Sequence, residues 1–152
     1  MIECITLSDD GYESWKDAMS QYGFPSGSWQ AARDYVSGEN LTIALVNSAP
    51  AGVFSWDKRI DSDDQVIRIC TRGTWVRPFF RRMGVGRAMW DHAINETKAK
   101  KISCGTVTWN GALFADAQKY RLGGRVEVMH HLDSFESREA IKSLSIRSRK
   151  SA

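Results

Sequence analysis

The chain has 152 residues, of which 42% are hydrophobic and 11% aromatic; this composition suits one domain with one core and excludes a disordered protein. No apolar run approaches the roughly 18 residues that span a bilayer, and the first six residues do not predict a signal peptide. The net charge of +3 is small for a protein of this size.

The first half of the chain predicts a strand, two helices and three further strands. Residues 2–7 alternate loosely, as a short strand does. Capping residues followed by helical spacing predict helices over about 9–21 and 28–37. Three strand-like segments with turn sequences between them follow: 41–46, then 51–57 after the turn at 47–50, then 65–76 after the turn at 61–64. Gly73 interrupts the last of these, and a glycine inside a strand often marks a bulge.

The second half of the chain alternates between helical and strand patterns. Residues 84–100 predict a strong helix, with apolar positions at steps of three and four. A strand over 102–109, a helix over 112–122 and a strand over 125–132 follow, and residues 133–136 resemble a capping box that opens a last helix. Strands that precede a strand-helix-strand unit predict an α/β (α+β) fold with a mixed sheet flanked by helices.

Positive charge is concentrated in two regions of different character. Residues 65–90 contain six arginines and no acidic residue, and residues 138–152 contain five basic residues and one glutamate. Without that C-terminal segment and its charge of +4, the chain has a net charge of −1 (3 − 4). The two basic regions therefore need separate explanations.

The first basic region joins the strand that ends at Val76 to the helix that begins at Gly84. Pro78 has no N–H and stops sheet pairing. A helix N-terminus exposes unpaired N–H groups and carries about half a positive charge from the helix dipole. Gly84 and Gly86 let a ligand approach the backbone, and three arginines add mobile charge: Arg81, Arg82 and Arg87. This arrangement is typical of a site for a pyrophosphate or a nucleotide phosphate.

Two other phosphate loops do not fit this stretch. A Walker loop needs Gly-Lys-Ser/Thr, which is absent from the sequence. A dinucleotide fingerprint needs a third small residue, and Met89 stands where it should be. A glycine loop that merely turns the chain remains the alternative.

The loop resembles the acetyl-CoA loop of the Gcn5-related N-acetyltransferase (GNAT) family, Arg/Gln-x-x-Gly-x-Gly/Ala. Residues 81–86 match it and Arg87-Ala88 follows, while Val76-Arg77-Pro78 resembles the family's Val-x-Pro at the end of its fourth strand. The order of the predicted elements agrees with the family from residue 2 to about 132. The resemblance implies one GNAT acetyltransferase domain over residues 1–134, with a mostly antiparallel, twisted sheet of about six to seven strands, and a basic C-terminal helix or tail over 135–152.

The resemblance also implies that acetyl-CoA is the cofactor. The backbone of Val76 and of residues 83–87 would hold the pantetheine arm and the pyrophosphate, where the fourth and fifth strands splay apart. The side chains of Arg81 and Arg82 would add charge at the phosphates, and Asn110 stands at the family's cofactor-contacting asparagine. The expected cofactor-binding residues are Val76, Arg81, Arg82, Met83, Gly84, Val85, Gly86, Arg87 and Asn110.

Tyr120 is the expected catalytic residue. Residues 120–124 resemble the family's Tyr-x-x-x-Gly-Phe, although Arg125 replaces the phenylalanine and the spacing from Asn110 is about three residues longer than usual. In relatives this tyrosine protonates the departing CoA thiolate. A phenol with a pKa of about 10 can donate to a sulfur whose thiol pKa is about 8.5. The alternative is an aromatic residue that packs the last helix turn.

No general base is apparent in the sequence. Many relatives place a glutamate in the fourth strand at a position that falls near Cys70, and this strand offers no carboxylate. Asp57, at the end of the third predicted strand, either acts through water or simply solvates the strand end. His130 and His131 alternate between the two faces of the last strand, and a structural role is expected for both. Deprotonation of the amine through ordered water is therefore the default.

The remaining residue types are assigned to packing. Cys4, Cys70 and Cys104 form no Cys-x-x-Cys pair, which argues against a disulfide framework or a metal site and fits buried thiols in the cytoplasm. Most tryptophans are core candidates. Phe24 and Trp29 lie in the first predicted helix pair, which covers the acceptor site in relatives, and are candidates to shape a pocket.

Two functions stay open at this point. The first is an acetyltransferase that moves an acetyl group directly to a primary amine of a small molecule or protein. The second is a catalytically weak GNAT-fold module that binds a nucleic acid or a protein. The basic tail fits nucleic acid, although a solvated terminus is the commoner meaning. Three apolar tail residues would allow a homodimer contact: Ile141, Leu144 and Ile146.

Overall fold

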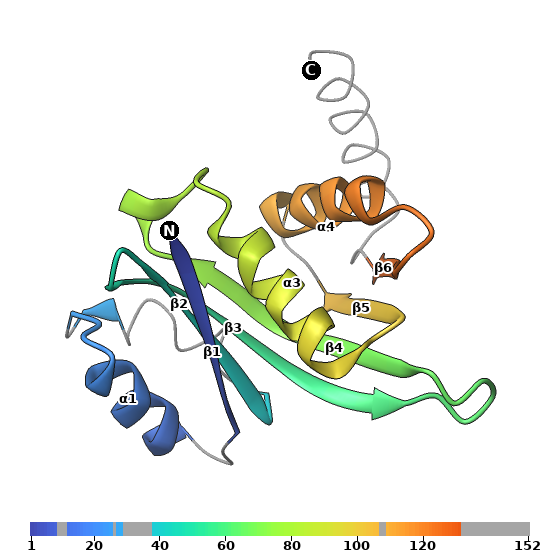
Figure 1. The fold of residues 1–152 in the computed structure, drawn as a ribbon, viewed down its shortest axis with the longest axis horizontal. Helices are drawn as coiled ribbons and strands as arrows, with labels where there is room; N and C mark the ends of the chain where they lie inside the picture. The colour runs from blue at the N-terminus through green and yellow to red at the C-terminus, as the bar shows by residue number, and fades with distance from the viewer. Residues whose placement is uncertain (9–11, 26, 29–37, 107–108, 132–152) are drawn as a thin grey trace.

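The computed structural model describes residues 1–8, 12–25, 27–28, 38–106 and 109–131 (Figure 1). The strands are β1 (Ile2–Ser8), β2 (Asn40–Val46), β3 (Ala49–Ile60), β4 (Ile67–Val76), β5 (Lys101–Thr106) and β6 (Glu127–His131). The helices are α1 (Tyr12–Gln21), the short 3-10 helix η2 (Pro78–Phe80), α3 (Val85–Thr97) and α4 (Trp109–Leu122). The helices predicted over 28–37 and after 133 fall almost wholly outside the described residues. No helix of the described part is long and apolar enough to cross a bilayer.

The strands form one sheet in the order β1-β2-β3-β4-β5-β6. Neighbouring strands from β1 to β4 run antiparallel, whereas β5 runs parallel to β4 and β6 parallel to β5. The connections through α3 and α4 explain this change. A crossover helix returns the chain to the end of the sheet at which the preceding strand began, so the next strand runs parallel to it. The predicted α/β class, with a mixed and mostly antiparallel sheet flanked by helices, is confirmed.

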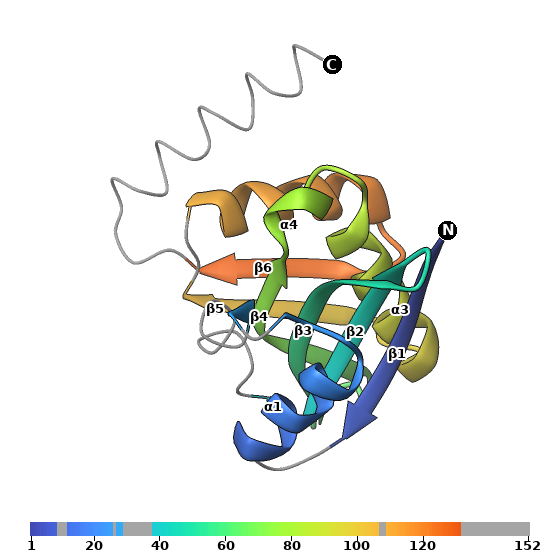
Figure 2. The ribbon, with the colours of Figure 1, turned by 90° about the vertical axis from the view of Figure 1, so that its left-hand side faces the viewer.

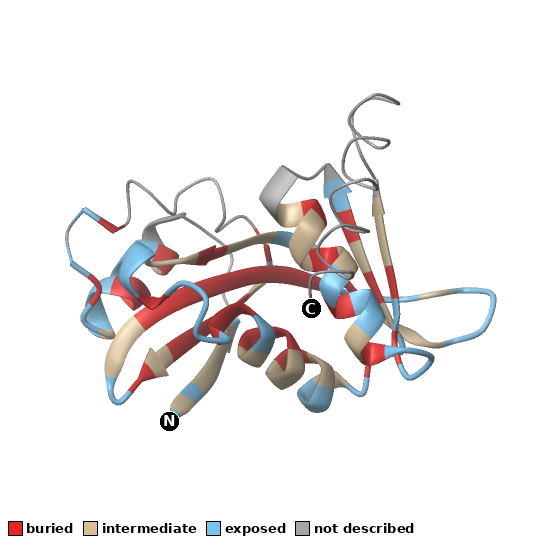
Figure 3. Cartoon of the chain, turned by 90° about the horizontal axis from the view of Figure 1, so that it is seen from above, coloured by how far each residue is buried: buried red, intermediate tan, exposed pale blue. Residues whose placement is uncertain are grey.

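Two buried clusters cover the two faces of the sheet. Helix α1 packs on one face with a cluster that contains Trp15, Met19 and Phe24, while α3 and α4 cover the other with a larger cluster around Trp90 and Met89. Figure 2 shows α1 and α3 on opposite sides of the strands. Strand β3 lies between the two clusters and is buried over most of its length (Figure 3).

A bulge in β4 changes which face its side chains point to. The pairing with β3 leaves Arg72 as an extra residue between Thr71 and Gly73. Ile69, before the bulge, packs in the cluster under α3, whereas Trp75, also odd-numbered, packs in the cluster under α1. In a regular strand, residues separated by an even number share one face. The bulge indicated by the glycine in this strand is therefore confirmed.

The two hairpin turns differ in how they are stabilised. Asn47 and Ser48 connect β2 to β3 with φ values of 48° and 71°, the left-handed conformation that two-residue hairpins favour. The predicted connection also included Pro50, but this residue lies in β3 beside a register irregularity, where a proline is tolerated. In the β3–β4 turn, the Asp61 carboxylate accepts hydrogen bonds from Arg68 and from Lys101 of β5. These bonds lower the pKa of Asp61 to about 2.

Candidate active site

The chain leaves β4 and enters α3 through a loop held against the sheet. The Arg77 N–H donates to the Ala51 carbonyl of β3, and the Arg77 side chain donates to the Pro50 carbonyl at 2.7 Å. Pro78 then begins η2, so β4 ends at Val76, as the missing proline N–H predicts. Arg77 also lies over the Phe80 ring at 5.4 Å. These contacts fix where α3 begins.

The N-terminus of α3 has no side-chain cap. Its N-cap is Gly84, with φ 82°, and no acidic residue stands in the first turn. The first hydrogen bond back to the cap runs from the Ala88 N–H to the Gly84 carbonyl, so the N–H groups of residues 85–87 have no partner within the helix. An uncapped N-terminus without a carboxylate, beside exposed arginines, suits an anion.

The two glycines of the loop have different surroundings. A Cβ on Gly84 would meet nothing within 4 Å, so a ligand can approach it, as predicted. A Cβ on Gly86 would lie 3.1 Å from the Phe114 ring of α4. The lack of a side chain at Gly86 therefore makes room for the Phe114 ring, and approach of a ligand to its backbone stays a prediction. Phe114 in turn packs edge-on against Trp90, with ring centroids 5.1 Å apart.

The loop arginines differ in what their side chains do. Arg81 donates from Nε to the Val76 carbonyl at 2.9 Å, and so folds back over the end of β4. Arg82 is exposed and has φ 64°. Arg87 is exposed on the first turn of α3, with its Nε 4.0 Å from the Asp91 carboxylate. Arg82 and Arg87 thus present positive charge to solvent beside the α3 N-terminus.

Strands β4 and β5 separate beside this loop. Their pairing extends only from Arg68↔Lys101 to Thr71↔Cys104, although β4 continues to Val76 (Figure 1). Because the Arg77 N–H points toward β3, the N–H and C=O of Val76 point the other way, into the opening. The splay implied by the resemblance is confirmed, and one unpaired edge of β4 leads from it to the α3 N-terminus.

Two residues of α4, Asn110 and Tyr120, were also named from the sequence. Asn110 lies in the first turn of α4, and its side chain is outside the described part. The Tyr120 side chain is 76% exposed near the helix end. The hollow beside it is lined by Asp116, Lys119 and Gly123, with no residue of the loop or of β4. The role of Tyr120 as a catalytic residue therefore stays a prediction.

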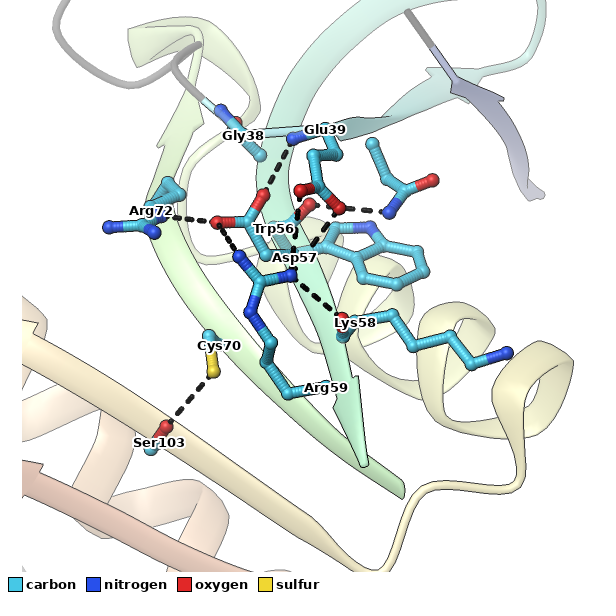
Figure 4. Close-up of polar contacts among 11 residues, drawn as sticks. Gly38, Glu39, Trp56, Asp57, Lys58, Arg59, Cys70, Arg72 and Ser103 are labelled. Carbon is cyan, nitrogen blue, oxygen red and sulfur yellow. Dashed lines mark hydrogen bonds and ion pairs between the residues drawn. The ribbon is translucent and has the colours of Figure 1, made fainter. Parts of the chain in front are cut away.

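The face of the sheet that carries α1 has a polar end, beside the splay (Figure 4). Asp57 was expected at a solvated strand end, but β3 continues to Ile60 and Asp57 is only 3% exposed. Its carboxylate accepts hydrogen bonds from the Glu39 N–H at 2.7 Å and from Arg72 Nε at 2.6 Å, and Arg59 lies 3.7 Å away. Both carboxylate oxygens of Asp57 therefore already have a hydrogen-bond donor from the protein.

The other base and pocket candidates also have defined positions. Cys70 is half-buried on β4 and accepts a hydrogen bond from Ser103 Oγ on β5 at 3.6 Å. His130 and His131 lie in β6, and the His131 side chain is outside the described part. Phe24 is a core residue under α1, which contradicts its predicted role in a pocket, and Trp29 falls outside the described residues.

The thiols follow the sequence interpretation only in part. Cys104 is buried, and burial raises its pKa. Cys4 is half-buried, and burial together with the Asp91 charge raises its pKa to about 11. No group of three or more potential metal ligands occurs among the described residues.

The Acetyltransferase (GNAT) family model matches residues 5–119, well over half of the chain, and the chain therefore belongs to this family. GNAT acetyltransferases take their acetyl group from acetyl-CoA. The open β4 edge and the uncapped α3 N-terminus fit that molecule, because one offers backbone groups and the other binds anions.

Comparison with solved structures finds similar chains at low sequence identity. An integron cassette protein from the mobile metagenome of V. cholerae is 12% identical, with a TM-score of 0.50 over 80% of this chain and 84% of that one. A putative acetyl transferase from Pyrococcus furiosus is 20% identical, with a TM-score of 0.47 over 77% and 91%. The aminoglycoside N-acetyltransferase AAC(6')-Iy in complex with CoA is 18% identical, with a TM-score of 0.44 over 81% and 87%. No curated protein matches the sequence.

Proposed function

We propose that this protein transfers an acetyl group from acetyl-CoA to a primary amine of a small-molecule or protein acceptor. The observation that carries the proposal is the uncapped N-terminus of α3, which follows the unpaired edge of β4 through the loop of residues 77–83. Bound acetyl-CoA supplies an acetyl thioester. The amine attacks it directly, with no acetyl group held by the protein between donor and acceptor.

The roles that we propose for individual residues are those that the family pattern implies. The backbone of Val76 binds the pantetheine arm, and the N–H groups of residues 83–87 bind the pyrophosphate. Arg82 and Arg87 add charge there, and Arg81 joins them when its bond to the Val76 carbonyl is exchanged for a phosphate. Asn110 contacts the cofactor from the start of α4. Tyr120 donates a proton to the departing sulfur, and ordered water accepts the proton of the amine.

Gly84 offers the sharpest test of the cofactor site. Gly84→Glu adds bulk and negative charge beside the pyrophosphate, whereas Gly84→Gln adds the same bulk and the same strain at φ 82° without the charge. We expect calorimetry with CoA to show binding abolished in the Glu variant and only weakened in the Gln variant. Equal affinity of the two folded variants would show that the loop does not bind the phosphates.

A binding module with little catalytic power remains a second candidate. The exposure of Tyr120, at 76%, is the observation that favours it. The two functions differ in turnover but not in cofactor binding. Native mass spectrometry that finds CoA on a protein unable to release thiol from acetyl-CoA with any amine would favour the module.

A further inference from the structure

An arginine and a buried carboxylate on the α1 face of the sheet have no part in the proposed cofactor site. Arg72 of β4 donates from Nε to Asp57 of β3 at 2.6 Å. The Asp57 side chain is 5% exposed, whereas the Arg72 side chain is 50% exposed. Figure 4 shows both on neighbouring strands, below the start of β2 and close to Cys70.

The position of Arg72 relates it to the reacting end of the cofactor. Arg72 is the bulge residue, and it comes directly after Thr71, where the pairing of β4 with β5 ends. Four residues at about 3.3 Å each separate it from Val76, or about 13 Å of strand. An arm that enters at the α3 N-terminus and follows the unpaired edge therefore ends beside Arg72.

The contacts of Arg72 fix its guanidinium and leave donors available. The Nε bond to the buried carboxylate sets the plane of the group, and the other Asp57 oxygen is held by the Glu39 N–H. Within the described part of the chain, no hydrogen bond is made by the terminal nitrogens of Arg72. A guanidinium held in this way presents a planar fork that matches a carboxylate or a phosphate in two hydrogen bonds.

The neighbouring charges do not compete for this fork. Two guanidiniums, those of Arg59 and Arg72, face two carboxylates, those of Asp57 and Glu39. The Glu39 carboxylate is 3.4 Å from Arg59, so each carboxylate already has a cationic partner. The positive and negative charges of the cluster therefore balance. The part of the cluster that remains for an anion on the α1 side is the pair of terminal nitrogens of Arg72.

We propose that Arg72 binds an anionic oxygen group of the acceptor, so that the substrates of this enzyme are amines that also carry a carboxylate or a phosphate. This inference rests on the proposed acetyltransferase function and specifies its acceptor class. Asp57 acts as a positioning residue, because it orients the guanidinium without touching the acceptor.

Matched pairs of amines test the inference. Lysine with cadaverine, tyrosine with tyramine, and phosphoethanolamine with ethanolamine each differ by one anionic group. The first two pairs test recognition of a carboxylate, and the third tests recognition of a phosphate. We expect a kcat/KM preference of about tenfold or more for the anionic member of at least one pair, the size expected of a charge-assisted hydrogen bond. In Arg72→Gln this ratio should fall toward one, through the KM of the anionic amine.

Two further variants make the result decisive. Lys58→Gln removes an equal charge from β3, on the opposite face of the sheet, and should keep the wild-type ratio. Arg72→Lys keeps a cation beside Asp57 but lacks the fork, so it tests recognition if the Gln variant does not fold. The inference is overturned if only neutral amines or no panel members are acetylated, or if both Arg72 variants keep the preference. Failure of the wild-type protein to bind CoA would instead overturn the proposed function itself.

Discussion

At the scale of single residues, Tyr120 carries the proton transfer to the departing sulfur in the proposed chemistry, and it is 76% exposed. If it is the general acid, Tyr120→Phe should lower kcat about a hundredfold or more and leave the KM for acetyl-CoA nearly unchanged. Steady-state kinetics with a responsive amine gives both constants. Unchanged turnover would assign Tyr120 to the surface of α4 and favour water as the proton donor.

Gly86 illustrates what a motif leaves open about a residue. The pattern Arg-x-x-Gly-x-Gly places it in a phosphate loop, and a glycine there is easily interpreted as room for a ligand. The room is taken by Phe114, from a helix 28 positions further along the chain (114 − 86). No local signal in the sequence points to that contact, because it depends on how α4 lies across α3.

At the scale of elements, Gly38 anchors the start of β2 to β3. A Cβ there would lie 2.7 Å from both Ser55 Oγ and the Trp56 nitrogen. We expect Gly38→Ala to lower the free energy of unfolding by about 1–3 kcal/mol, as overpacking does. Urea unfolding measures the change. Gly124→Ala is the matched control, since its Cβ would meet nothing within 4 Å, and an equal loss in both variants would contradict the explanation.

The Asp61 cluster joins the ends of β3, β4 and β5 and makes stability depend on pH. Hydrogen bonds from Arg68 and Lys101 lower the pKa of Asp61 to about 2, below its unfolded value of about 3.9. The folded state therefore binds the proton more weakly, and this contribution is complete above about pH 5 and lost as the pH falls toward 2. Asp61→Asn should be less stable than the wild type at pH 7, with the difference shrinking between about pH 4 and 2.

Urea unfolding of both proteins across this pH range measures that difference. Asp63→Asn, in the same turn, is the matched control and should change stability little at any pH, because Asp63 is exposed. A wild-type advantage over Asp61→Asn that persists unchanged at pH 2 would show that the ion pairs do not stabilise the turn.

At the scale of the whole molecule, residues 135–152 carry positive charge that has no role in the proposed cofactor site. We expect their deletion to leave CoA affinity unchanged, because the proposed cofactor site lies in residues 76–110. If the tail binds nucleic acid, the full-length chain should bind RNA with an affinity that falls steeply with salt. Filter binding and calorimetry on both chains separate the cases, and loss of CoA binding in a folded deletion variant would place the tail at the active site or a dimer contact.

The fold was more predictable from the sequence than the site. Alternation, helical spacing and turn residues are local signals, and the strands and helices predicted within the described residues agree with the structure apart from a few residues at their ends. The contact between Asp57 and Arg72 joins residues 15 apart (72 − 57), and the bulge sets the position of Arg72. Gly73 predicted an irregularity in this strand, but it did not predict that Arg72 would be the extra residue of the bulge.

The bulge also means that Arg72 is an insertion in an otherwise regular ladder. Thr71 pairs with Trp56 and Gly73 with Ser55, and those partners are adjacent in β3. A chain that lacked position 72 could therefore keep every rung of the ladder and every side chain on its present face. The backbone pairing of the sheet therefore does not require this residue. A deletion there would remove a guanidinium from the proposed acceptor side without changing the register of β3 and β4.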